Sequence, residues 1–325
     1  MAPPRSTRSR RLVASVLGGT ALATLLPLVA GTPANAATAP PLCASKTHPA
    51  LAAKVAKDVK AALAGRSSTV GLYVWDKNTA VYCSHNLDRH FDSASVVKAT
   101  IMAAVLRRAQ EQHRKLTSWE TSELRLMITR SDNTAATNLW NSVGRTRFKA
   151  YLKLAGMTGT VPGSGGYWGL TQIDAHDELK LLRTFTDDHT ALSATWRAYA
   201  LKLMSEVTPS QRWGVPYKAP KGSLVSNKNG WLPRATRAWR VHSIGAVTGG
   251  GRDYLMAVLS DNDKTMQYGI DTVQRITLVL NRDLGGASGT KAAATRSTAL
   301  PQAATGVDAP LPGSDGSAPF GAVRQ

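Results

Sequence analysis

The pattern of hydrophobic positions changes twice along this chain. Short runs rich in β-branched and aromatic residues occupy 69–75 and 80–85 near the start, and 239–247 and 254–260 near the end. Each pair flanks a short polar or glycine-rich segment, which predicts two β-hairpins. Between the hairpins, from 95 to about 205, apolar residues recur at helical spacing. Strands at both ends with helices in the middle predict a sheet whose chain is interrupted by a helical insertion.

Two amphipathic stretches, 49–64 and 265–284, lie outside the strand runs and predict a helix near each end of the folded region. These helices would pack on the sheet, with the inserted helices, about 95–215, beside it. The predicted fold class is therefore α+β, an antiparallel sheet flanked by terminal helices with an all-helical domain inserted, layered α/β/α. A functional site is expected in the cleft between the parts.

Both ends of the chain are predicted to lie outside the folded domain, which is expected within 37–286. Residues 1–36 begin with four arginines, continue with an uncharged segment and end in Ala-Asn-Ala, which is typical of an export signal. The apolar part is short and contains Pro27, so we expect a secreted protein without a membrane span. The paired arginines fit either the general or the twin-arginine export route. Residues 287–325 are mostly Ala, Gly, Ser, Thr and Pro, which predicts a disordered tail.

The charge balance is strongly basic. Lysine and arginine number 40 and aspartate and glutamate 21, for a formal charge of +19, and a 43% hydrophobic content excludes disorder throughout. Removal of the signal would leave a charge of +15. Such a charge ordinarily suggests nucleic acid, but an exported protein meets anionic wall polymers and lipid head groups instead. Retention at an anionic cell wall, or a surface that only keeps the protein soluble, therefore explains the charge better than nucleic-acid binding.

Two cysteines, Cys43 and Cys83, suit an oxidising compartment and are predicted to form one disulfide. Two thiols are too few for a zinc site, and no His-Glu-x-x-His sequence occurs. We predict no metal and no cofactor.

Three short motifs could carry chemistry. The first is Ser95-Val96-Val97-Lys98, which places the Lys98 ammonium one helical turn after the Ser95 hydroxyl. That spacing can activate a serine, and a helix start favours developing negative charge. The same pattern recurs at 288–291 in the predicted tail, so the pattern alone is weak evidence.

The second and third motifs each have an alternative interpretation. Ser-Asp-Asn at 131–133 leads into a helical pattern, where its alternative role is a helix N-cap. The same letters at 260–262 end a strand and are interpreted as a turn. Lys-Asn-Gly at 228–230 follows a strand-like run, and its glycine would let a ligand approach an edge strand. Its alternative is a hairpin turn, because Asn-Gly is common there.

The order of these three motifs in one exported chain resembles the signature of serine β-lactamases and penicillin-binding proteins. From Pro49 to Leu284 the chain is similar to the class A β-lactamase group, in a looser branch of β-lactamase-related serine hydrolases found in secreted actinomycete-type proteins. The resemblance implies a sheet packed with helices beside an all-helical domain, in agreement with the layout above. It also implies acyl-serine chemistry within 37–286.

The resemblance assigns roles to the motif residues. Ser95 would be the nucleophile and Lys98 its activating partner. Ser131 would pass a proton to the leaving nitrogen, Asn133 would hold the substrate's side-chain amide, and Lys228 would attract its carboxylate.

The remaining assigned residues are Asn229, Gly230 and Trp231, which would complete the substrate-binding set. The backbone N–H groups of Ser95 and Trp231 would form the oxyanion hole. Family members usually carry Thr or Ser in place of Asn229, although an amide can also donate a hydrogen bond to a carboxylate.

A second departure concerns turnover. Class A enzymes have a glutamate in an Ω-shaped loop that activates the deacylating water, whereas the matching segment 159–171 contains no acid. The nearest carboxylates, Asp174, Asp177 and Glu178, fall in a new helical pattern with a Thr-x-x-Asp capping arrangement, which favours a structural role. Slow deacylation is therefore expected.

Two further sets of residues could face the cleft. The aromatic residues could line it or could equally belong to the hydrophobic core; they are Tyr167, Trp168, Trp213 and Trp231. The candidates for binding a substrate carboxylate are Arg234, Arg237 and Arg240.

The predicted function is a secreted, monomeric serine hydrolase that hydrolyses β-lactams, or is acylated by them, through an acyl-Ser95 intermediate with slow deacylation. One alternative is a D-alanyl-D-alanine peptidase that acts on cell-wall peptides, for which the missing glutamate is expected. Another is a basic, wall-associated binding protein with vestigial catalysis. A Ser-His-Asp mechanism is disfavoured because no Gly-x-Ser-x-Gly sequence occurs.

Overall fold

The computed structural model describes residues 40–187 and 191–286. The chain divides after Pro40 into two units, and every element named below belongs to the second, which starts at Pro41. The predicted signal over 1–36, the predicted tail over 287–325 and the Ser-x-x-Lys pattern at 288–291 lie outside the described residues.

A six-stranded antiparallel sheet forms the centre of this unit, with the strand order β1-β3-β2-β8-β7-β6. Its strands are β1 (Cys43–Ala44), β2 (Thr69–Asp76), β3 (Val81–His85), β6 (Leu224–Pro233), β7 (Trp239–Gly249) and β8 (Arg252–Asp261). The two predicted hairpins meet where β2 pairs with β8, with Leu72 opposite Val258. The sheet therefore joins segments far apart in the sequence, and β6 is at its edge.

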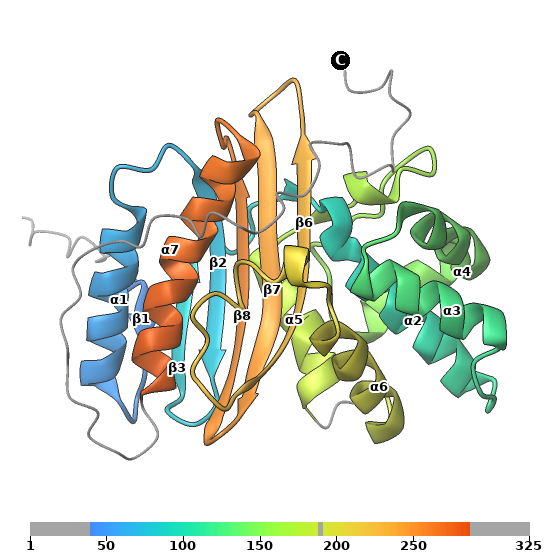
Figure 1. Cartoon of the computed structure of the whole chain (residues 1–325), viewed down its shortest axis with the longest axis horizontal. Coiled ribbons are helices and arrows are strands. Elements are labelled where there is room, and N and C mark those ends of the chain that lie inside the picture. The colour runs from blue at the N-terminus through green and yellow to red at the C-terminus, as the bar shows by residue number, and fades with distance from the viewer. Residues whose placement is uncertain (1–39, 188–190, 287–325) are drawn as a thin grey trace, which may run out of the picture. The chain divides into compact units, whose positions relative to one another are not determined.

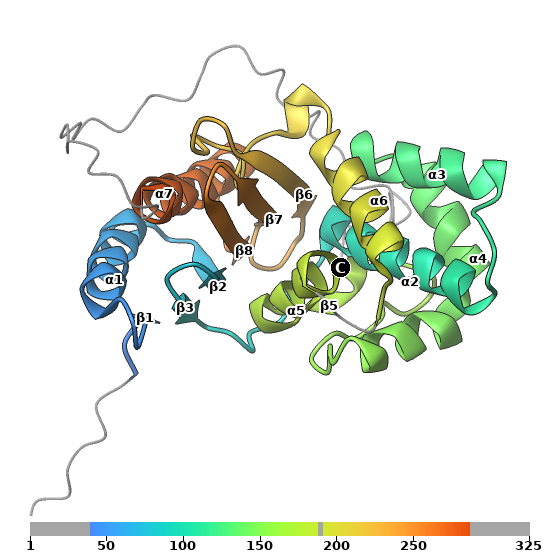
Figure 2. The same ribbon diagram turned by 90° about the horizontal axis from the view of Figure 1, so that it is seen from below.

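Helices cover both faces of the sheet (Figure 1). Helices α1 (Pro49–Leu63) and α7 (Met266–Gly285) pack together on one face. On the other side lie the helices of the insertion, α2 (Val97–Glu111), α3 (Ser118–Thr129), α4 (Asn133–Leu154), α5 (Ala175–Thr186) and α6 (Ala194–Ser205). Figure 2 shows the same separation of the two helical groups by the sheet in a view turned by 90°. The predicted α+β class with a layered α/β/α arrangement is confirmed.

The smallest strands escape prediction from sequence. Strands β1, β4 (Phe91–Asp92) and β5 (Gln172–Ile173) have two residues each, too few to show an alternating pattern. Strands β4 and β5 form a separate pair, with Phe91 opposite Ile173. This pair holds the segment before the first motif against the end of the 159–171 loop.

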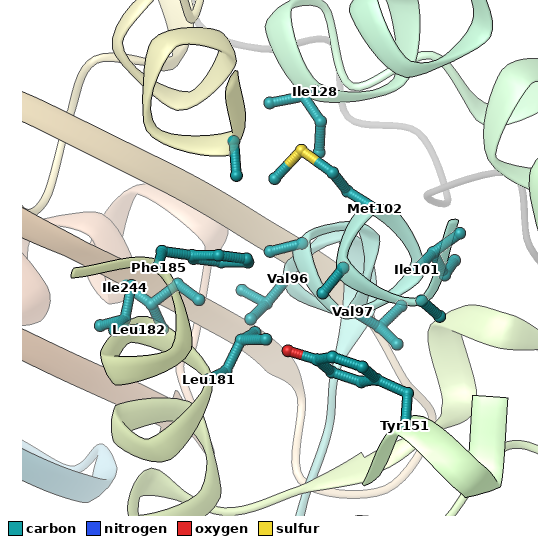
Figure 3. Close-up of a cluster of buried hydrophobic side chains, with 14 of the residues drawn as sticks. Val96, Val97, Ile101, Met102, Ile128, Tyr151, Leu181, Leu182, Phe185 and Ile244 are labelled. Carbon is teal, nitrogen blue, oxygen red and sulfur yellow. The ribbon is translucent and has the colours of Figure 1, made fainter. Parts of the chain in front are cut away.

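Two hydrophobic cores lie on opposite faces of the sheet. One includes Val74 of β2 and Ile276 of α7. The other includes Val97 of α2, Leu182 of α5 and Ile244 of β7, and Figure 3 shows these side chains converging. Helix α2 is buried along most of its length because it carries small or apolar residues at most positions. This burial holds the start of α2, where the first motif lies, in a fixed place. None of the helices in the described ranges combines the length and the apolar character that crossing a membrane requires.

The predicted disulfide between Cys43 and Cys83 is present. The two residues are directly opposite in the β1–β3 pair, and both are buried. The bond ties the two-residue strand β1 to the edge of the sheet, where so few backbone hydrogen bonds would hold it weakly by themselves.

Replacing both cysteines, as Cys43→Ser/Cys83→Ser, is expected to lower the free energy of unfolding by about 3 to 4 kcal/mol, because the bond restricts the unfolded chain. Urea unfolding followed by tryptophan fluorescence measures the difference. Reducing agent should reproduce the loss in the wild type and leave the variant unchanged. Equal stability of the variant and the oxidised wild type would contradict the expectation.

Candidate active site

The first motif lies where a short 3-10 turn, η1 (Ala94–Val96), runs into α2. Ala94 has a φ of 46°, a left-handed backbone that non-glycine residues rarely adopt. The turn directs Ser95 to the edge of the insertion that faces β6, and Ser95 is 4% exposed. Lys98, in the first turn of α2, is fully buried.

The second motif lies directly before α4. Asp132 is the N-cap of this helix and accepts a hydrogen bond from the Ala135 N–H at 2.8 Å. Ser131 precedes the cap with a φ of 58°. Capping is therefore done by Asp132, and the Ser131 hydroxyl is available to contact the other motifs.

The third motif lies inside the edge strand β6, which excludes the hairpin-turn interpretation. The Lys228 side chain is directed to Ser131. Gly230 lies against the first motif, because a Cβ atom built on it would be 2.9 Å from the Ser95 nitrogen and 2.8 Å from the Val96 nitrogen. A glycine is needed here for a close approach of two backbones rather than for a turn.

The Ser131 hydroxyl lies between two lysines. Its Oγ accepts hydrogen bonds from Lys98 Nζ at 3.1 Å and from Lys228 Nζ at 3.0 Å. Lys98 Nζ also donates to the Ser131 carbonyl at 2.6 Å and to Asn133 Oδ1 at 2.7 Å, and Lys228 Nζ donates to the Asn229 carbonyl at 2.9 Å. Residues separated by more than a hundred positions in the sequence thus share one hydrogen-bonded group beside Ser95.

The electrostatics of the two lysines favour loss of a proton. Burial lowers the pKa of Lys228 well below its ordinary range, and the neighbouring Lys98 lowers it further. Two ammonium groups that contact one hydroxyl repel each other, so the pair favours the loss of one proton. A neutral amine at this position could accept a proton from a serine hydroxyl.

Asn229 is oriented differently from the expectation that it faces a ligand. It is fully buried, and its side-chain N–H groups donate to the carbonyls of Gln211 at 2.8 Å and Trp213 at 3.0 Å. Side chains alternate across a strand, so Asn229 lies on the face of β6 opposite Lys228. Its amide hydrogens are committed to the protein, and we leave Asn229 out of the proposed substrate contacts.

A sequence model described as a β-lactamase enzyme family matches residues 54–121 and 122–284, which is most of the described chain. The chain belongs to the β-lactamase enzyme family. Its relatives include the "Putative lipoprotein LppW" of Mycobacterium tuberculosis (strain ATCC 25618 / H37Rv), 26% identical over 225 residues that cover 66% of this chain and 68% of the relative.

Solved structures of similar fold include a β-lactamase from Sphaerobacter thermophilus DSM 20745 and a class A β-lactamase from Bacteroides cellulosilyticus DSM 14838. The first has a TM-score of 0.60 and 21% identity and covers 72% of this chain and 97% of that one. The second has a TM-score of 0.62 and 18% identity and covers 71% and 97%. At these identities the comparison establishes the fold.

In this member of the family an indole lies beside the lysine of the first motif. The 159–171 loop contains no acid, and its Trp168 is fully buried with its ring centroid 4.7 Å from Lys98 Nζ. Trp168 Nε1 donates to Thr137 Oγ1 at 3.1 Å, which fixes the ring. The loop is therefore closed against the site by an aromatic side chain that cannot act as a general base.

The acids that follow the loop have structural contacts. Asp174 is itself the N-cap of α5 and accepts from the Asp177 N–H at 2.7 Å, whereas the Thr-x-x-Asp pattern predicts a cap at Thr171. Asp177 accepts from the backbone N–H groups of Gly159 and Thr160 at 2.8 and 2.7 Å and so anchors the start of the loop. These contacts support a structural role for Asp174 and Asp177.

Glu178 is buried without a compensating partner. Its two carboxyl oxygens are enclosed, and neither has a hydrogen-bond partner among the described residues. Burial raises its pKa well above the ordinary range, and the charges of Asp177 and Asp174 raise it further. The folded protein therefore holds the Glu178 proton to a higher pH than the unfolded chain does.

Glu178→Gln is expected to remove part of the pH dependence of stability. Because the folded pKa is raised, wild-type stability is greatest below the unfolded pKa and falls as the pH rises from about 4.5. Between pH 4 and pH 8 the variant should gain stability relative to the wild type, because glutamine has no proton to lose as the pH rises. Urea unfolding at several pH values measures this difference, and parallel curves for the two proteins would refute the expectation.

The three candidate arginines all form ion pairs with aspartates of the same chain. Arg240 and Arg234 contact Asp92 through Nε at 3.1 and 3.4 Å, and Arg237 contacts Asp261 at 3.2 Å. Of the aromatic candidates, Trp213 is buried and packs on Trp231, Trp168 is buried in the second core, and Tyr167 is partly exposed.

Sequence reasoning missed His242, which supports the first motif from behind. Its Nε2 lies 2.9 Å from the Asp92 carbonyl, and its Nδ1 accepts from the Ser260 N–H at 3.1 Å, so Nε2 carries the proton. Burial lowers its pKa to about 4, which keeps it neutral. His242 is opposite Gly230 in the β6–β7 pair, a relation that no local motif reveals.

Proposed function

We propose that this protein is a serine hydrolase that reacts with β-lactams through an acyl-Ser95 intermediate. The observation that carries the proposal is the Ser131 hydroxyl, held by Lys98 and Lys228 at 3.1 and 3.0 Å, beside a Ser95 segment packed on Gly230. Membership in the β-lactamase enzyme family supports the same chemistry.

In the proposed reaction Lys98 acts in its neutral form, which requires that it give up one of its three donated hydrogen bonds, and it accepts the Ser95 hydroxyl proton while Oγ attacks the lactam carbonyl carbon. The backbone N–H groups of Ser95 and Trp231 stabilise the oxyanion. The carbon–nitrogen bond then breaks, and Ser131 gives its proton to the leaving nitrogen. Ser131 recovers a proton from the lysine pair that its oxygen contacts. The product is an ester between Ser95 and the opened ring.

Hydrolysis of this ester is expected to be slow. The loop over 159–171 offers no carboxylate to activate water, and the indole of Trp168 lies beside Lys98 instead. Intact-mass spectrometry of the purified protein with benzylpenicillin should show one adduct that persists after excess drug is removed. No adduct after long incubation would end the proposal, and rapid turnover without an accumulated adduct would contradict the slow step.

A D-alanyl-D-alanine peptidase is the second candidate. The loop without an acid favours it, because a peptidase passes its acyl group on without needing rapid hydrolysis of a β-lactam ester. Release of D-alanine from a D-alanyl-D-alanine peptide by the wild type, absent in Ser95→Ala, would support the peptidase. No release, together with formation of the penicillin adduct, would favour the β-lactam reaction.

The proposed location is outside the cell, at the anionic wall. The relative LppW is described as a lipoprotein, but in this chain the first cysteine, Cys43, is bonded to Cys83 and has no free thiol for a lipid. The formal charge of +15 that remains once the predicted signal is removed supports retention by wall polyanions instead. Release from isolated walls by salt would support this retention.

A further inference from the structure

The segment 208–213 links two walls of the site, and we refer to it as the brace. It follows α6, contains the short 3-10 turn η3 (Pro209–Gln211) and leads toward β6. The brace lies between the end of α3, directly before the second motif, and the strand that carries the third motif. Its central side chain, Gln211, is buried.

The brace is hydrogen-bonded to the residues directly before Ser131. The Thr208 N–H donates to the Thr129 carbonyl at 2.9 Å, and Gln211 Nε2 donates to the Arg130 carbonyl at 3.0 Å. Ser131 has a left-handed φ of 58°, a conformation of limited intrinsic stability that persists where neighbouring contacts hold it. The bond from Gln211 holds the peptide next to that residue.

The backbone carbonyl of Gln211 is hydrogen-bonded to side chains of β6. Its carbonyl accepts hydrogen bonds from Asn229 Nδ2 at 2.8 Å and from Asn227 Nδ2 at 3.3 Å, and Asn229 Nδ2 also donates to the Trp213 carbonyl at 3.0 Å. Both asparagines are fully buried. They lie on the face of β6 opposite Lys228, so the strand is held from one side while Lys228 contacts Ser131 from the other.

We propose that Gln211 is a positioning residue that sets the distance between Ser131 and Lys228. Its side chain holds the Ser131 peptide and its carbonyl holds β6 through Asn229, so one residue spans both walls. The side-chain amide of Asn229 is long enough to reach the brace from β6. The role in catalysis rests on the proposed acyl-Ser95 chemistry, whereas the role in geometry does not.

The test replaces Gln211 by methionine, which keeps the length of the side chain and removes the donor. Within the part of the chain that the structure describes, Gln211 Oε1 is buried without a hydrogen-bond partner. The substitution removes this unsatisfied acceptor while the Arg130 carbonyl loses its donor, so the unfolding midpoint should change little. The first-order rate of acylation by fluorescent penicillin should fall about tenfold at unchanged affinity for the first, reversible complex. The pH dependence of the rate should also change, because the Ser131 hydroxyl bridges the two lysines.

Gln267→Ala is the matched control, since it removes one exposed glutamine hydrogen bond, to Asp271, on α7. It should leave the acylation rate and pH profile unchanged. Asn229→Ala, which removes two of the three side-chain hydrogen bonds from β6 to the brace and leaves the longer one from Asn227, should reproduce the effect of Gln211→Met. Unchanged acylation in Gln211→Met, or a loss that merely follows lower stability, would overturn the proposal.

A readout independent of catalysis separates this proposal from the proposed function. If the wild type never forms a penicillin adduct, hydrogen exchange still tests the geometry. The backbone N–H groups of 130–132 should exchange faster in Gln211→Met than in the wild type and in Gln267→Ala. Equal protection in all three proteins would overturn the positioning role of Gln211.

Discussion

Ser95→Ala is expected to abolish covalent labelling by a fluorescent penicillin, with a loss of at least about a thousandfold in the acylation rate. The substitution removes only the hydroxyl oxygen of the proposed nucleophile, so the ester cannot form at this position. Because it removes a single oxygen atom and adds none, the fold should stay intact. Gel fluorescence over a time course, with unfolding curves for both proteins, measures the effect.

Ser93→Ala provides the matched control. Ser93 is two residues away, fully buried and directed to backbone carbonyls such as that of Gly169 at 3.3 Å. It should keep most of the labelling and lose some stability. Persistent labelling of Ser95→Ala at one site would assign the nucleophile elsewhere.

Gly230→Ala is expected to reduce acylation by at least about a hundredfold through geometry alone. The added Cβ would be 2.8 to 3.0 Å from Val96 N, Ser95 N and Ser93 O, which are backbone atoms that cannot turn aside. Either η1 or β6 must move, and Ser95 then leaves its place beside the oxyanion donors. The acylation rate and the mass of the adduct report the loss.

Gly286→Ala is the control for this substitution. A Cβ there has an ordinary contact of 3.5 Å with the Arg282 carbonyl, and the residue follows α7 far along the chain from the motifs. It should acylate like the wild type. Wild-type acylation by Gly230→Ala would show that the close approach of β6 and η1 is unimportant for the reaction.

Much of the fold could be predicted from sequence because its long elements have regular patterns. Strands β2 and β8 and helices α1 and α7 follow the predicted runs closely. The two-residue strands β1, β4 and β5 could not be predicted, because pairing partners rather than local pattern create them. The edge strand β6 extends through the third motif to Pro233, well beyond the predicted run.

Part of the candidate site could also be predicted, because its residues belong to short sequence motifs. Motif order predicted Ser95, Lys98, Ser131 and Lys228 as candidates, and in the structure Lys98 and Lys228 both donate to the Ser131 hydroxyl. The direction of Asn229 was not predictable, because a one-residue step along a strand reverses the face and only the register of β6 decides which face meets the site. Gln211 belongs to no sequence motif, so it could not be predicted from the sequence.

By itself, the sequence determined the types of chemical group and the order of the elements: a Ser-x-x-Lys helix start, two later polar motifs, a paired cysteine and an acid-free loop. Only the tertiary structure decided which groups meet. Sheet register placed Lys228 toward Ser131 and Asn229 toward Gln211, and loop packing placed the Trp168 ring beside Lys98. The physical reason is that local patterns encode burial and backbone conformation, whereas hydrogen bonds across the site depend on distances between segments that are far apart in the chain.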